Sequence, residues 1–242
     1  MRNPDRETIF RFKHFSVANR HSAMKVGTDG VLLGSWDVMP SPNAPLRVLD
    51  IGTGTGLIAL MMAQRYPDAA IDAVEIDSVA ADEAEMNVAA SPWRERIKVH
   101  CCNIVDFVAK RKYDIIVSNP PFFTDGIVST NNSRAIARHT ETLPFGLLMT
   151  NVARLLADSG VFAMISPAES LDALETEACV AGLYLCRRCN VFTKPGKPCR
   201  RILTLWKKEI GAVDEDNLFI HTADGAYSEE YTRLTGDFYL KF

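Results

Sequence analysis

The chain has 242 residues, of which 27 are lysine or arginine and 30 are aspartate or glutamate, and hydrophobic residues make up 47%. This composition is ordinary for a folded globular protein and excludes collagen-like and disordered chains. No apolar run approaches the ~20 residues of a membrane-spanning helix, and residues 1–7 lack the apolar stretch of a signal peptide. We therefore expect a cytoplasmic protein that does not bind membranes.

Positive charge is concentrated in two segments. Residues 1–25 hold six basic and two acidic residues, a net charge of +4, and residues 187–208 hold eight basic residues and no acid, a net charge of +8. Since the whole chain carries −3, the remainder carries −15. A localised basic surface on an acidic body can hold a phosphate backbone, so charge alone leaves open a nucleic-acid partner or two solvated charged faces.

Six cysteines are too few for a disulfide scaffold in a chain of this length, and we expect reduced thiols. Cys186 and Cys189 have the spacing of half a zinc site, and Cys199 follows ten residues later. Because a second pair is missing and the stretch is typical of a strand, the sequence predicts no metal site.

From residue 46 onward, short apolar runs alternate with segments of helical spacing. This alternation predicts βαβ units and an α/β fold with a doubly wound, mostly parallel, seven-stranded sheet. The expected strands are Leu46–Ile51, Ala70–Ile76, Ile97–Cys102, Tyr113–Ser118, Val161–Ser166, Leu183–Phe192 and Arg201–Lys207. The expected helices are Asp29–Val38, capped by Thr28 or Asp29, and Leu57–Tyr66, Val79–Ala90, Leu143–Ala157 and Leu171–Ala181.

The last two expected strands have no helix between them. They are joined by Thr193–Pro198, whose glycine and prolines favour a turn, so the sheet is expected to end in an antiparallel hairpin. We divide a single domain over 1–242 into an N-terminal segment with a short helix (1–45), the sheet that carries the site (46–208) and a C-terminal extension (209–242).

A glycine-rich loop follows the first strand of this sheet, at the edge where open α/β sheets bind ligands. Asp50, Gly52, Gly54 and Gly56 form the pattern D-x-G-x-G-x-G, whereas a dinucleotide fingerprint has G-x-G-x-x-G. The glycines allow close approach of a ligand to the backbone. Asp50 would repel a diphosphate but suits the cationic end of S-adenosylmethionine. The pattern favours this cofactor over a plain cluster of loop glycines.

The next two strand ends carry further polar side chains. Glu75 is expected to bind both ribose hydroxyls, while Asp77 suits a helix cap. After the third strand, the side-chain amide of Asn103 can meet an adenine edge, with Ile76 and Ile104 as apolar walls. The alternative for Asn103 is a role in the turn alone.

The motif Asn119-Pro120-Pro121-Phe122 follows the fourth strand directly. Successive prolines keep the Pro120 carbonyl out of a helix or a ladder, so it converges with the Asn119 amide oxygen on one point. Two such acceptors can bind both N–H groups of a poorly nucleophilic amino group and restore electron density to its nitrogen as it attacks a sulfonium methyl group. Phe122 would stack on the base, with Phe123 beside it. We assign Asn119 to both cofactor and catalysis; a plain turn is the alternative.

Together, the glycine loop and the Asn-Pro-Pro-Phe motif resemble the Rossmann-like S-adenosylmethionine-dependent (class I) methyltransferases that act on amino groups. Further stretches are similar to signatures of the bacterial tRNA1(Val) (adenine-37-N6)-methyltransferase family: Phe12–Phe15, Met24–Gly34, Ala137–His139, Lys194–Arg201, Tyr227–Tyr231 and Asp237–Phe242. The resemblance covers essentially the whole chain. It implies methylation of the N6 amino group of adenine 37, 3′ of the anticodon.

The resemblance also implies roles for residues whose spacing alone indicates none. It places Lys25, Gly27, Thr28 and Asp29 near the methionine end of the cofactor, Arg138 and His139 toward substrate, and Lys194, Lys197, Arg200 and Arg201 on RNA phosphates. The implied partner is the anticodon stem-loop of a tRNA. Phe122 departs from many relatives of the motif, which have tyrosine; stacking survives this change but a hydroxyl contact does not. No heptad pattern is visible, so we expect a monomer.

Three alternatives remain at this level. A protein glutamine N5-methyltransferase needs the same Asn-Pro-Pro clamp, but residues 1–45 are too short for the substrate-binding domain that usually precedes it. A non-catalytic RNA-binding module would have no physical need of the acceptors at Asn119 and Pro120. A hydride-transferring oxidoreductase shares the fold class, and the glycine spacing disfavours it.

Overall fold

In the part of the chain that the structure describes, eight strands form one sheet in the order β10-β8-β9-β7-β6-β3-β4-β5. The computed structural model describes residues 9–20, 26–38, 46–121 and 143–241. In chain order the strands of this sheet are β3 (Arg47–Ile51), β4 (Ala70–Glu75), β5 (Ile97–Cys101), β6 (Tyr113–Ser118), β7 (Leu156–Pro167), β8 (Tyr184–Phe192), β9 (Arg201–Lys207) and β10 (Asp214–Phe219). Only β9 runs against its neighbours β7 and β8. The other neighbouring strands are parallel, which confirms the expected mostly parallel sheet.

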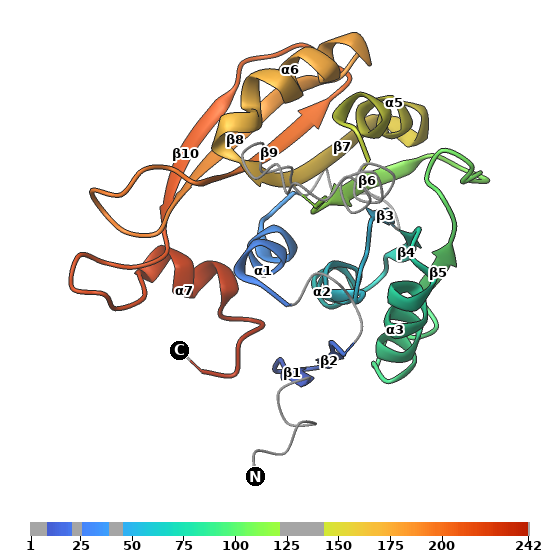
Figure 1. Ribbon diagram of the computed structural model, residues 1–242, viewed down its shortest axis with the longest axis horizontal. Coiled ribbons are helices and arrows are strands. Elements are labelled where there is room, and N and C mark those ends of the chain that lie inside the picture. The colour runs from blue at the N-terminus through green and yellow to red at the C-terminus, as the bar shows by residue number, and fades with distance from the viewer. Residues whose placement is uncertain (1–8, 21–25, 39–45, 122–142, 242) are drawn as a thin grey trace, which may run out of the picture.

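Helices cover both faces of the sheet, as the doubly wound prediction requires (Figure 1). They are α1 (Thr28–Ser35), α2 (Leu57–Arg65), α3 (Ser78–Ala89), α5 (Phe145–Leu155), the 3-10 helix η2 (Ala168–Ser170), α6 (Leu171–Val180) and α7 (Glu229–Thr235). One core cluster lies between the sheet and α1 and α2, and a second lies on the α5–α6 face. No helix in these ranges has the length and apolar character needed to span a membrane.

The sheet has one strand more than the expected seven, and the extra strand comes from the segment expected to be an extension. β10 has the sequence DEDNLF, which lacks the alternation of apolar residues that marks a strand. It forms because it pairs in parallel with the basic strand β8, where Arg187 binds Asp216 at 2.9 Å and Arg188 binds Glu215. Its charges also suit an edge strand, since they discourage pairing with another chain. The hairpin of β8 and β9 is therefore present, but β10 lies outside it.

The first and last segments that the structure describes pack together beside α2. A short hairpin of β1 (Ile9–Arg11) and β2 (Ser16–Ala18), which the sequence did not predict, is joined to the C-terminal segment through an antiparallel bridge from Phe12 to Tyr239. α1 ends at Ser35, earlier than expected. Its N-cap is Gly27, without a side-chain hydrogen bond, so the prediction that Thr28 or Asp29 caps this helix is wrong.

Candidate active site

Three acidic or amide side chains point to one face of the sheet at its carboxyl edge. Asp50 of β3 lies between Leu49 and Ile51, which belong to the core on the α5–α6 face, so its own side chain faces α1 and α2. The same alternation places Glu75 of β4 and Asn119, the residue after β6, on this face. β3 lies between β4 and β6. The fold therefore brings together the three strand ends that the sequence singled out.

The glycine loop binds mainly to itself and to β4. The φ angles of Gly52, Gly54 and Gly56 are 70°, 56° and 81°, a region that favours glycine. The N–H groups of Gly52 and Thr53 donate to the Val74 carbonyl at 2.9 and 3.1 Å, and that of Gly56 donates to Thr53 at 2.9 Å. With the Gly54 N–H on Glu75, four of the five loop amides bind acceptors of the chain itself. The loop is thus a tight turn rather than a cradle for phosphates.

Asp50 occupies the place where dinucleotide-binding folds hold a pyrophosphate. Its side chain is fully buried, and Oδ2 accepts hydrogen bonds from the Thr53 hydroxyl at 2.6 Å and from the Ala59 N–H, in the first turn of α2, at 3.1 Å. A carboxylate at this helix N-terminus excludes a diphosphate. Burial raises the pKa of Asp50 to about 7, although these two hydrogen bonds oppose the shift. The geometry weighs against the oxidoreductase alternative.

Glu75 is fixed by three backbone N–H groups. Oε2 accepts from Gly54 at 2.8 Å, and Oε1 accepts from Ile76 at 2.9 Å and from Asp77 at 3.0 Å. A carboxylate offers about four acceptor positions, so at least one remains for a ribose hydroxyl. Asp77 caps α3, because its Oδ1 accepts the Val79 N–H at 2.9 Å. Its predicted role as a cap is confirmed.

Of the three residues expected around the adenine ring of the cofactor, only Ile76 is well placed to contact it. Asn103 Oδ1 accepts the Val105 N–H at 3.0 Å, which is the turn geometry foreseen as its alternative role. Ile104 is 5% exposed and packs in the core with Phe107, so little of its side chain can contact a ligand. Ile76 is 56% exposed and free to form a wall.

Asn119 lies between α1 and the start of α2. A Cβ atom built on Gly30 of α1 would stand 3.9 Å from Asn119 Nδ2 and 3.0 Å from a methyl group of Leu57, so only glycine leaves this space open. Asn119 Oδ1 is buried and has no hydrogen-bond partner in the described part of the chain. Ser118 donates to the Ile51 carbonyl at 2.9 Å and so ties the end of β6 to the end of β3.

Asn119 Oδ1 and Asp50 Oδ1 are both buried at this edge and lack partners among the described residues. Buried acceptors are costly unless a donor reaches them. S-adenosylmethionine carries an ammonium group, and an adenine carries an amino group, which are donors of the kind these oxygens require. The side chains present therefore fit the cofactor expected from the sequence.

Comparison with known proteins also points to a methyltransferase. The methyltransferase small domain family matches residues 30–146. The tRNA1(Val) (adenine(37)-N6)-methyltransferase of Phocaeicola vulgatus is 47% identical over 232 residues, 96% of this chain and 97% of that protein. Its namesake in Bacteroides thetaiotaomicron is 45% identical over 242 residues, 99% of each chain. The chain belongs to this family.

Solved structures support the fold of the methyltransferase. A predicted O-methyltransferase from Agrobacterium tumefaciens has a TM-score of 0.63 with 19% identity, and the match covers 87% of this chain and 96% of that one. A putative RNA methyltransferase from Pyrococcus horikoshii has a TM-score of 0.51 with 18% identity, over 69% and 76% of the two chains. At these identities the likeness establishes the Rossmann-like class I fold and no more.

Asp29 was expected near the cofactor and Arg201 on RNA phosphates, but in the methyltransferase the two side chains bind each other. Arg201 Nε donates to Asp29 Oδ2 at 2.8 Å, which joins β9 to the first turn of α1. Gly27 and Thr28, at the start of this helix, are exposed. The other predicted site residues on the N-terminal segment and after the Asn-Pro-Pro motif lie outside the described residues: Lys25, Phe122, Phe123, Arg138 and His139.

The basic segment over residues 187–208 is about half neutralised within the methyltransferase. Four of its eight basic residues form ion pairs, with partners on β10, on α1 and after α5: Arg187 with Asp216, Arg188 with Glu215, Arg201 with Asp29, and Lys208 with Asp158. Lys194, Lys197 and Arg200, which we call the basic turn, form no ion pair within the ranges described. The cationic surface that the charge count predicted is therefore confined mainly to this turn.

Sequence reasoning missed two buried residues of α3 that support the site. Asn87 is 4% exposed, and its Nδ2 donates both to the Thr55 carbonyl of the glycine loop at 2.8 Å and to Ala18 at 2.9 Å, while its Oδ1 accepts the Ala18 N–H at 2.8 Å. Glu83 accepts the Arg20 N–H. Both are polar residues on the alanine-rich face that α3 buries, and this pattern could have indicated them.

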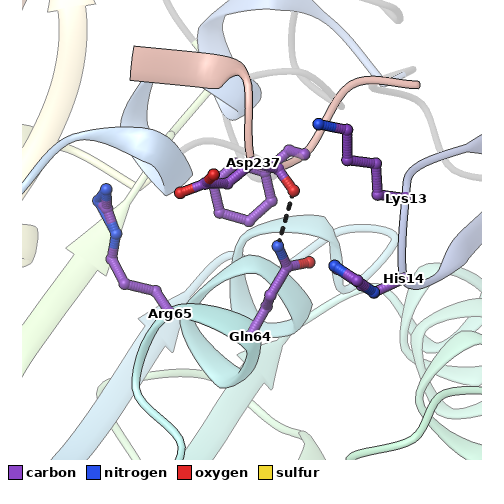
Figure 2. Close-up of a pocket in the computed structure, with 6 residues that line it drawn as sticks. Lys13, His14, Gln64, Arg65 and Asp237 are labelled. Carbon is purple, nitrogen blue, oxygen red and sulfur yellow. Dashed lines mark hydrogen bonds between the residues drawn. The ribbon is translucent and has the colours of Figure 1, made fainter. Parts of the chain in front are cut away.

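A separate cavity of about 450 Å³ lies at the opposite end of α2 (Figure 2). It is lined by Lys13, His14, Gln64, Arg65, Asp237 and Phe238. α2 has nine residues, so the cavity lies about 13 Å along the helix from the glycine loop. In Figure 2 the Gln64 amide points to the Asp237 carbonyl, to which it donates at 2.9 Å. Among the predicted site residues that the structure describes, none lines this cavity.

Proposed function

We propose that this methyltransferase transfers the methyl group of S-adenosylmethionine to the N6 amino group of adenine 37 in tRNA1(Val). The observation that carries the proposal is the buried amide oxygen of Asn119 beside the glycine loop, for which the described residues offer no hydrogen-bond partner. The relatives' names supply the substrate. We propose that residues 1–242 act as one domain, as a monomer, and in the cytoplasm, where tRNA is found.

Asn119 and Pro120 prepare the nucleophile. The lone pair of an adenine amino group is delocalised into the ring, so the nitrogen attacks poorly. Asn119 Oδ1 and the Pro120 carbonyl each accept one N–H of this group, which raises the electron density on nitrogen and orients its lone pair. When bound, S-adenosylmethionine supplies an electrophilic methyl group on its sulfonium. The surplus proton becomes acidic once nitrogen has formed its fourth bond and leaves to solvent.

Residues around the glycine loop would hold the cofactor. Asp50 Oδ1 would accept from its ammonium group, directly or through a water molecule, and the open acceptor position of Glu75 would take a ribose hydroxyl. Ile76 would cover the adenine ring, with the Asn103 amide at its edge and Ile104 supporting from the core. The family resemblance adds Lys25, Gly27, Thr28 and Asp29 near the methionine end.

The protein is proposed to bind its tRNA substrate at the anticodon stem-loop. Phe122 and Phe123 would contact the target base, Arg138 and His139 would lie near it, and Lys194, Lys197 and Arg200 would bind phosphates. Since Arg201 binds Asp29, its contribution to RNA binding would be to position the basic turn. An anticodon loop is already partly unstacked, so the target adenine can be presented at a cost of only a few kcal/mol.

The decisive experiment is transfer of labelled methyl from S-adenosylmethionine to tRNA isolated from a strain that lacks this protein, followed by nucleoside mass spectrometry of anticodon-loop fragments. N6-methyladenosine at position 37 with the natural chain, and none with Asn119→Ala, is the expected result. Asn217→Ala, the same change on the outer strand β10, is the matched control. Methyl label in glutamine of protein, and none in tRNA, would instead support the glutamine N5 alternative.

A further inference from the structure

Two phenylalanines end the neighbouring parallel strands β8 and β10. Phe192 and Phe219 are partners in the register of these strands, their ring centroids are 5.0 Å apart and their planes are inclined by 22°. Both side chains are only partly buried. Stacked aromatic rings at the exposed end of a sheet offer a flat apolar surface to a ligand.

The face that carries this pair is polar rather than part of the core. Cys189 and Val191 of β8 point into the core, so Arg188, Asn190 and Phe192 point to the opposite face. There Arg188 and Asn190 both bind Glu215 of β10. The two phenylalanines thus continue a row of hydrophilic cross-strand pairs, and the core on the α1–α2 face does not account for them.

The aromatic pair adjoins the basic turn. The N–H of Ile220 donates to Phe192 at 2.9 Å, and that of His221 donates to Thr193 at 3.0 Å, so the chain leaving β10 runs beside the residue that precedes Lys194. His221 in turn stacks on Tyr227, with ring centroids 4.9 Å apart. Figure 1 shows the β8–β9 turn and the segment between β10 and α7 on the same side of the molecule.

We propose that the Phe192–Phe219 pair is a stacking platform for an unpaired base of the RNA substrate, whose phosphates are bound by the basic turn. The inference rests on the proposed function. The charges favour RNA over an acidic or apolar protein surface, because the platform combines bare aromatic area with Lys194, Lys197 and Arg200, the pattern by which single-stranded nucleic acid is bound. Two of the three acids of β10 do not oppose it, since Arg187 neutralises Asp216 and Arg188 neutralises Glu215, and the third, Asp214, lies at the other end of the strand from Phe219.

The platform lies on the catalytic edge, a few nucleotides from the target base. β8 is antiparallel to β9, and β9 is antiparallel to β7, so β8 ends at the same edge as β6. The strands β8 and β6 are three positions apart in the sheet, which corresponds to about 14 Å, and the side chains of Phe192 and Asn119 point to opposite faces of it. The base on the platform is therefore another nucleotide of the same loop and not the adenine that is methylated.

Binding of an anticodon stem-loop RNA, measured over a range of salt concentrations, tests the platform. Phe192→Leu and Phe219→Leu keep apolar bulk but remove the ring face, and we expect each to weaken binding about 5- to 150-fold without changing the salt slope. Phe192→Tyr should bind like the natural chain. Lys197→Ala should instead lower the slope by about one. Phe10→Leu, an exposed aromatic residue of β1, is the matched control.

A second readout does not depend on variants. The fluorescent base 2-aminopurine, placed at each loop position in turn, should be quenched by the natural chain at one position other than the target. Unchanged binding by the leucine variants overturns the platform, and so does the absence of such quenching, provided that the natural chain methylates the RNA. Failure of the natural chain to bind or methylate any tRNA would overturn the proposed function itself.

Discussion

Arg201 Nε donates to Asp29 Oδ2 at 2.8 Å, and this ion pair fastens the first turn of α1 to the strand that follows the basic turn. The next residue of α1, Gly30, lies against Asn119. A contact between residues 172 positions apart thus connects the segment proposed to bind RNA with the residue proposed to prepare the nucleophile.

Removing this ion pair should lower the rate of methyl transfer while leaving the free energy of unfolding nearly unchanged. Both side chains are partly exposed, so we expect Arg201→Ala to cost about 0–1 kcal/mol of unfolding free energy. Loss of the anchor should nevertheless lower kcat/KM for tRNA, because α1 is no longer held beside Asn119. Methyl transfer and urea unfolding measure the two effects. Arg201→Lys, which keeps a cation beside Asp29, should recover part of the activity; equal activity of all three proteins would contradict the connection.

Two glycines of α1 should respond differently to alanine. At Gly30 the added Cβ would lie 3.0 Å from Leu57, so a small shift next to Asn119 suffices, and we expect lower activity with a change in stability of about 1 kcal/mol or less. At Gly34 the Cβ would lie 2.5 Å from Met61 Sδ, and overpacking should cost about 1–3 kcal/mol with activity per folded molecule retained. Thermal unfolding and methyl transfer distinguish the two outcomes.

Stability should depend on pH through Asp50. Its folded-state pKa of about 7 lies above the ordinary value of 3.8, so the folded chain binds this proton more tightly than the unfolded chain. The stabilisation is complete below about pH 4 and is lost as pH rises through 7, by up to about 1.4 kcal/mol per pH unit. Urea unfolding from pH 5 to 8 should show this slope in the natural chain and not in Asp50→Asn. Parallel curves for the two would contradict the assignment.

Cofactor binding should release protons near neutral pH. A cation placed beside Asp50 favours the ionised carboxylate and lowers the pKa from about 7. Calorimetric titration with S-adenosylmethionine at pH 7, in buffers of different ionisation enthalpy, should reveal this release. Asp50→Asn should abolish it, and a release that persists in the variant would have to come from another group.

Asn87 should be important both for stability and for the cofactor. Its amide makes three hydrogen bonds that join α3, β2 and the glycine loop, and all of them are lost in Asn87→Ala. We expect a loss of about 2 kcal/mol or more in unfolding free energy, since buried backbone groups lose their partners. Weaker binding of S-adenosylmethionine should accompany it through the Thr55 end of the loop. Thr176→Ala, which removes an exposed hydrogen bond of α6, serves as the control.

The parts of the molecule that depend on local pattern were predictable, and those that depend on distant partners were not. Tyr113–Ser118 and Arg201–Lys207 were predicted to the residue because apolar runs and turn residues mark their limits. The strand β10 was not predicted, because its acidic residues form a strand only against the arginines of β8. In the candidate site, Asp50, Glu75 and Asn119 could be identified because each lies at or directly after the end of a predicted strand. The buried face of α3 could have indicated Asn87, but no spacing rule could reveal that its partner is the glycine loop, or that Asp29 binds Arg201.

The pairing of an acidic strand with a basic one has a consequence for selectivity. Every cation on a protein surface raises its affinity for all RNA alike, since each phosphate is the same. Because Asp216 and Glu215 pair with Arg187 and Arg188, these two arginines no longer attract RNA phosphates. The cationic surface is then confined to a small area at the basic turn. An RNA that merely carries charge would gain little there, whereas one that also offers an unpaired base at the right distance would be retained. Discrimination among cellular RNAs would then depend on the shape of the loop.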